Sequence, residues 1–115
     1  MTYQRNTTDL HDDLASAIAV AREKFARKAG SDLAKTAGVG EDMVWRVRDD
    51  ITGNAATLEG QVMSGYEAST VRGIVKAFAD VLGSDVTDWE ATADLSGVEA
   101  SAPFAGLKVI VWGVA

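Results

Sequence analysis

The chain has 115 residues, of which 47% are hydrophobic and 24% charged, an ordinary composition for one small globular domain. The absence of cysteine excludes a disulfide framework and any metal site built from thiolates. The formal net charge of −6 argues against a nucleic-acid partner, and no apolar run reaches the roughly 18 residues of a membrane span.

The charges are unevenly distributed along the chain. Residues 20–48 have a balance of +3, whereas residues 81–115 have a balance of −4. Because DNA responds to the charge of the face that it meets, this asymmetry is compatible with one basic face and an acidic tail. The polar, acidic N-terminus is unlike a secretory signal, so we expect a cytoplasmic protein with no membrane partner.

The first half of the chain predicts three helices. Between Asp9 and Ala29, apolar residues recur every three or four positions, as on one face of an amphipathic helix: Leu10, Leu14, Ile18, Ala21, Phe25 and Ala29. Gly30 is expected to end this helix, and Ser31 to cap a short one that runs to about Thr36. Residues 38–40 (GVG) predict a turn, and a third helix is expected over 41–50.

The second half predicts one long helix and one strand. We expect a loop over 52–67, with a short helical turn at 58–63, and then a helix that is capped by Ser69 or Thr70 and stops at Gly83. A short helix over 87–93 and a linker over 97–106 follow. Residues 107–114 (LKVIVWGV) are β-branched and aromatic, which favours a strand.

Residues 30–49 fit the pattern of a helix-turn-helix, in which two short helices cross around a tight turn. The positions expected to be small or apolar hold, in order, Leu33, Ala34, Ala37, Gly38, Val39, Val44 and Val47. The stretch LAKTAGVGEDMVWRVRDD therefore resembles the lambda-repressor-like (XRE and Cro) family, and STVRGIVKAFADVLGSDV at 69–86 resembles a later helix of that family. The resemblance spans roughly residues 9–86. It implies a mainly all-α fold of four to five helices, with the strand at the C-terminus outside it.

The resemblance also implies which residues bind DNA. In this family the helix after the turn lies in the major groove. The residues expected to meet bases or backbone are Arg27, Lys28, Lys35, Gly40, Glu41, Asp42, Trp45, Arg46, Arg48 and Asp49. Arg46 and Arg48 are the natural guanine or phosphate contacts. Glu41 and Asp42 also suit the first turn of any helix, and Trp45 alternatively completes the core.

The strand at the C-terminus predicts a second function, because an isolated strand must pair with something. Its residues Leu107, Val109, Ile110, Val111 and Trp112 are expected to pair with a second copy across a two-fold axis; the alternative is pairing within the chain. We therefore divide the chain into a helix-turn-helix domain (1–94) and a linker with a dimerisation strand (95–115).

No residue pattern supports catalysis. His11 stands alone, adjacent carboxylates on a helix point about 100° apart, and residues 53–60 lack the lysine of a phosphate-binding loop. We expect no enzyme activity, cofactor, metal or small-molecule substrate. The sequence thus predicts a homodimeric repressor or Cro-like regulator, of a bacteriophage or mobile element, that reads double-stranded operator DNA. The alternative is a helix-turn-helix scaffold that binds a protein, as an antitoxin or anti-repressor does.

Overall fold

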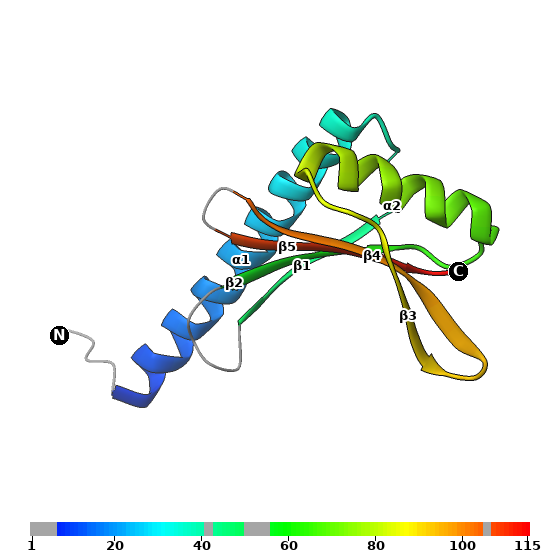
Figure 1. Ribbon diagram of the computed structural model, residues 1–115. Coiled ribbons are helices and arrows are strands. Elements are labelled where there is room, and N and C mark those ends of the chain that lie inside the picture. Colours follow the sequence, from blue (N-terminus) through cyan, green and yellow to red (C-terminus); the bar gives the residue numbers. More distant parts are fainter. Residues whose placement is uncertain (1–6, 41–42, 50–55, 105–106) are drawn as a thin grey trace, which may run out of the picture.

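The computed structural model describes residues 7–40, 43–49, 56–104 and 107–115, which form two helices and one five-stranded sheet (Figure 1). In chain order the elements are α1 (Thr7–Ala37), β1 (Met43–Asp49), β2 (Ala56–Val62), α2 (Ala68–Leu82), β3 (Thr87–Thr92), β4 (Leu95–Phe104) and β5 (Leu107–Val114). The expectation of a mainly all-α fold with four to five helices is therefore wrong, because the fold is mixed α/β.

The sheet has the strand order β1-β2-β5-β4-β3. Only β2 and β5 are parallel, and α2 with the β3–β4 hairpin forms the crossover that a parallel pair requires. β5, the last strand in the chain, thus lies at the centre of the sheet. The domain boundary expected between residues 94 and 95 falls in the turn of the β3–β4 hairpin.

The helix-turn-helix expected over residues 30–49 is not formed. α1 continues without a break through Gly30 and Ser31 to Ala37, so the two helices expected over 9–36 are one. Gly30 does not end the helix; it is buried where the helix passes close over Trp45, and a Cβ there would lie 2.2 Å from the indole ring. The turn is found where it was expected, with Gly38 at φ +73°.

The segment expected to be the DNA-reading helix forms β1 instead. Along β1 the half-buried Met43, Trp45 and Val47 alternate with the exposed Val44, Arg46 and Arg48. This is the two-residue period of a strand with one buried face, and the valines and tryptophan suit a strand better than a helix. Glu41 and Asp42 lie outside the described residues.

Three further segments form strands where a loop, a short helix or a linker was expected. β2 replaces the loop expected over 52–67, β3 the short helix over 87–93, and β4 the linker over 97–106. Each of these segments contains glycine, alanine or acidic residues, which are depleted in strands, so local propensity is weak and pairing with neighbouring strands decides their structure.

Two elements were predicted with nearly correct bounds. α2 begins at Ala68 and ends at Gly83, whose φ of +69° closes the helix as expected. Its N-cap is Glu67, without a side-chain cap hydrogen bond, rather than Ser69 or Thr70. β5 spans Leu107–Val114 as predicted.

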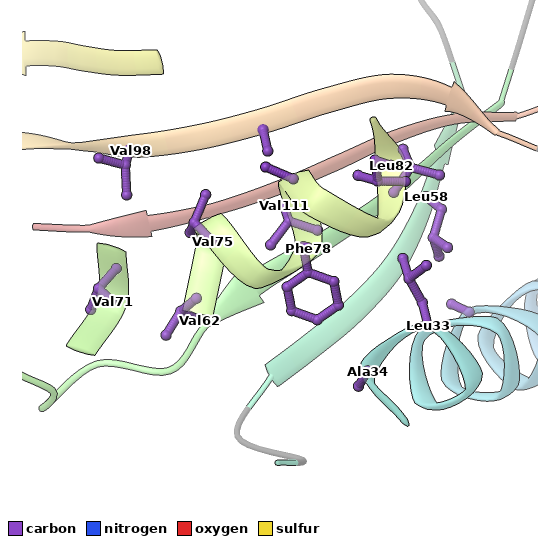
Figure 2. Close-up of a cluster of buried hydrophobic side chains, with 14 residues drawn as sticks. Leu33, Ala34, Leu58, Val62, Val71, Val75, Phe78, Leu82, Val98 and Val111 are labelled. Atoms are coloured by element: carbon purple, nitrogen blue, oxygen red, sulfur yellow. The ribbon is translucent and has the colours of Figure 1, made fainter. Parts of the chain in front are cut away.

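Both helices pack against one face of the sheet, α2 against β4 and β5 and α1 against β1. Phe78 is fully buried in the centre of this layer, among apolar side chains from both helices and the inner faces of the strands (Figure 2). Its ring meets that of Trp45 edge-on, with the centroids 5.7 Å apart. No helix of the described residues covers the opposite side of the sheet, which we call the open face.

The molecule is elongated because α1 extends past the sheet. The radius of gyration is 17.5 Å, whereas a compact domain of this length has a radius of gyration of about 13 Å. Figure 1 shows the N-terminal half of α1 projecting beyond the strands. The side chains of residues 10 and 12–25 are all exposed, and burial starts at Ala26. We call residues 10–25 the α1 arm.

Candidate protein-docking surface

The α1 arm carries large apolar side chains that the described chain leaves about half exposed. Their exposed fractions are 49% for Leu10, 56% for Leu14, 54% for Ile18 and 46% for Phe25. At about 100° per residue, these four and Ala21 fall within an arc of about 80° around the helix axis. We call this row of five residues the apolar stripe.

The apolar stripe is not an extension of the face that α1 buries against the sheet. The buried residues of α1 are Ala26, Gly30, Leu33 and Ala34. Around the helix axis, these buried side chains point about 140° away from the side chains of the apolar stripe. The sequence correctly indicated one apolar face over 9–29, but that face is exposed. The signal for the buried face was the small residues Ala26, Gly30 and Ala34, four positions apart, which allow close contact with β1.

At its C-terminal end the apolar stripe leads into a hollow of about 320 Å³ between α1, the end of α2 and the sheet. Its lining residues are Phe25, Ala29, Asp32, Leu33, Thr36, Leu58, Val81, Leu107 and Val109. Phe25 thus belongs to both the stripe and this α1/α2 hollow. Together they form one continuous, mostly apolar surface along one side of the longest helix.

Charge changes sign along α1. Residues 7–19 contain Asp9, Asp12 and Asp13 and no lysine or arginine, a balance of −3. Residues 20–28 contain four basic residues and one acidic residue, a balance of +3: Arg22, Lys24, Arg27 and Lys28, with Glu23. The docking surface is therefore flanked by acidic residues at one end and basic residues at the other.

Among the described residues, those expected to bind DNA do not form one surface. Arg27 and Lys28 are exposed on α1, where they form ion pairs one turn away with Glu23 and Asp32; Lys35 is exposed in its last turn. Gly40 follows the turn, and Trp45 is half-buried against the core, the alternative considered for it. Asp49 ends β1.

Arg46 and Arg48 lie on the open face, on the other side of the sheet from the buried face of α1. Both contact Glu59, whose side chain is only 4% exposed. Arg46 Nε donates to Glu59 Oε1 at 3.0 Å, and Arg48 Nε lies 2.7 Å from Oε2. Trp112 Nε1 also donates to Oε1, at 3.0 Å. The Glu59 cluster thus ties β1, β2 and β5 together across the open face, a partner set that the sequence did not indicate.

The dimerisation expected through the strand at the C-terminus has no free edge to use. β5 pairs with β2 along one edge and with β4 along the other, which is the alternative of pairing within the chain. Its faces are as expected: Val109 and Val111 are buried on the helix side with Leu107, whereas Ile110 and Trp112 are half-buried on the open face. Trp112 meets Trp89 edge-on there, with centroids 5.9 Å apart.

The described residues offer no group of three or more histidine or acidic side chains placed to hold a metal ion. Within the same residues, no helix is both long and apolar enough to span a membrane. Comparison of the chain with protein-family models, with curated proteins and with solved structures gives no match.

Proposed function

We propose that the chain is a protein-interaction module that joins an assembly through the apolar stripe of its α1 arm. The observation that carries this proposal is the row of large apolar side chains, each about half exposed, on a helix that projects from the fold. Contiguous apolar patches on soluble proteins mark interaction sites, whereas single exposed apolar residues do not. The spacing of the stripe is that of helices recognised by grooves or by other helices.

Burial of the apolar stripe contributes free energy to docking. Full burial of a large apolar side chain contributes about 1.5–3 kcal/mol, so covering the exposed halves of the four large side chains contributes on the order of 3–6 kcal/mol. The arm also gains order, because a helix of this length with no tertiary packing is marginally stable in water. A partner that covers the stripe therefore stabilises both the surface and the helix that presents it.

The resemblance predicted recognition of operator DNA by a helix over residues 41–50. Its reading helix is a strand, and the two arginines expected to contact guanine are held by Glu59 on the open face. Binding to a protein was the alternative prediction, and it is retained here on a different surface, the α1 arm instead of the acidic helix expected at 41–50.

Site-specific photo-crosslinking in the native cells tests the proposal. A photoreactive phenylalanine analogue replaces Leu14 in one variant and Val20 in a matched control. Both side chains lie on the arm and are about equally exposed, at 56% and 51%, but they point about 120° apart around the helix. We expect a product of discrete mass from position 14 and none from position 20. No product from position 14, or the same products from both, would overturn the proposal.

A further inference from the structure

We infer that the partner of the α1 arm is a second copy of this chain, paired with it through antiparallel α1 helices around a two-fold axis. This inference rests on the proposed docking function. A two-fold interface uses the same patch on both copies, so that patch must be complementary to itself. The apolar stripe meets this requirement because a row of apolar side chains packs against its own copy.

The charges on α1 select the antiparallel direction. When two copies run antiparallel and cross near Ala21, residues 7–19 of each, with a balance of −3, lie beside residues 24–36 of the other, with a balance of +3. In a parallel pair, acidic residues face acidic residues and basic residues face basic ones, which disfavours association. Asp13 and Lys28 lie on the same flank of the apolar stripe. In an antiparallel pair, Asp13 of one copy therefore lies near Lys28 of the other.

The shape of the surface fixes the approximate position of the axis. The stripe begins at Leu10, and the α1/α2 hollow lies beside Leu33. If Leu10 of each copy enters the hollow of the other, the axis passes close to Ala21, midway between these two residues. Ala21 is exposed and lies on the stripe, and its small side chain lets the two helices approach closely where they cross.

Sedimentation velocity of the full chain tests the pairing directly. We expect a species of twice the 12.1 kDa chain mass at tens of micromolar. Leu14→Glu places two carboxylates in the interface and is expected to weaken the dimer about 100-fold or more. Val20→Glu makes the same charge change on a side of the arm that the second copy does not cover, so the dimer should stay intact. A monomer of the unaltered chain throughout this range would overturn the inference.

Single cysteines test the direction, because the chain has none of its own. Under mild oxidation Ala21→Cys, close to the axis, is expected to form a disulfide-linked dimer, whereas Leu10→Cys is not. Cross-linking at both positions would show a parallel pair and overturn the antiparallel arrangement. Asp13→Lys is expected to weaken the dimer, and adding Lys28→Asp to restore it.

The two proposals fail in different ways. A monomeric chain whose position 14 still cross-links to a different protein, at a discrete mass, contradicts the second copy but leaves the docking function standing. A monomeric chain with no cross-link at position 14 contradicts both.

Discussion

Replacing Gly30 by alanine tests the packing that separates this fold from a helix-turn-helix. In the middle of a helix, alanine is ordinarily more favourable than glycine by about 1 kcal/mol. At residue 30, however, the new Cβ would lie 2.2 Å from two atoms of the Trp45 ring, whereas carbon atoms in contact prefer about 3.5–4.0 Å. The ring or the helix must therefore move by more than an ångström.

The net effect is a loss of stability. Forcing extra volume into a packed site costs about 1–3 kcal/mol or more, which exceeds the gain in helix propensity. We expect Gly30→Ala to lower the free energy of unfolding by roughly 1–2 kcal/mol. Gly73→Ala is the matched control: Gly73 is exposed in α2, and no atom lies within 4 Å of its added Cβ. That substitution should stabilise the chain by about 0.5–1 kcal/mol.

Urea unfolding followed by circular dichroism measures both changes, and a double-mutant cycle assigns the cause. In a Trp45→Ala background the obstacle is gone, so Gly30→Ala should become neutral or stabilising. If Gly30 instead ended a helix with positive φ, the substitution would cost about the same in both backgrounds. Equal losses in the two backgrounds, or a gain equal to that of Gly73→Ala, would refute this packing.

Three further substitutions test other parts of the molecule. Phe78→Ala empties the centre of the core and should cost about 3–5 kcal/mol in urea unfolding; a loss below about 1 kcal/mol would contradict its placement. Replacing Arg46 and Arg48 together leaves the buried Glu59 carboxylate only Trp112, so the double loss should exceed the sum of the single losses; additive losses would contradict the shared cluster. Asp80 accepts a hydrogen bond from Lys76 and raises the pKa of that amine above 10.5, so Asp80→Asn should lower the pKa in an NMR titration. Because the folded pKa is raised, this pair stabilises the fold below pH 10.5, and the two proteins should converge in stability as the pH rises above it.

The elements predicted from sequence are those whose local signals agree with their packing. α2 has an apolar row with helical spacing and a glycine stop, and it buries that row under its own sheet. β5 is a run of β-branched residues and lies at the centre of the sheet, where both edges are paired. In these two segments the local pattern was sufficient.

The helix-turn-helix was predicted from residue types that also suit a different packing. Ala34 is small because α1 passes close over β1, not because two short helices cross, and Gly30 serves the same close approach instead of ending a helix. Gly38 takes a left-handed conformation in either arrangement. The pattern against the motif was WRVR at residues 45–48, where apolar and basic residues alternate with the two-residue period of a strand.

The sequence predicts the residues of the candidate site but not their exposure. The apolar face of the first helix is evident in the sequence, but the sequence alone assigns such a face to the core. Its exposure depends on where the sheet ends relative to α1, which is set by strand pairing between distant residues. Glu59 likewise joins residues on two other strands, up to 53 positions away from it, and no local pattern indicates this cluster.

Hydroxyl-radical footprinting over a concentration series measures directly whether a second copy covers the apolar stripe of the α1 arm. We expect oxidation of Leu14 and Phe25 to slow as the chain concentration rises from about 1 to 100 µM, a range that spans weak to moderate affinities. Val20, on an uncovered side of the same arm, should react at a constant rate. Unchanged reactivity of all three side chains at every concentration would contradict an apolar stripe covered by a second copy.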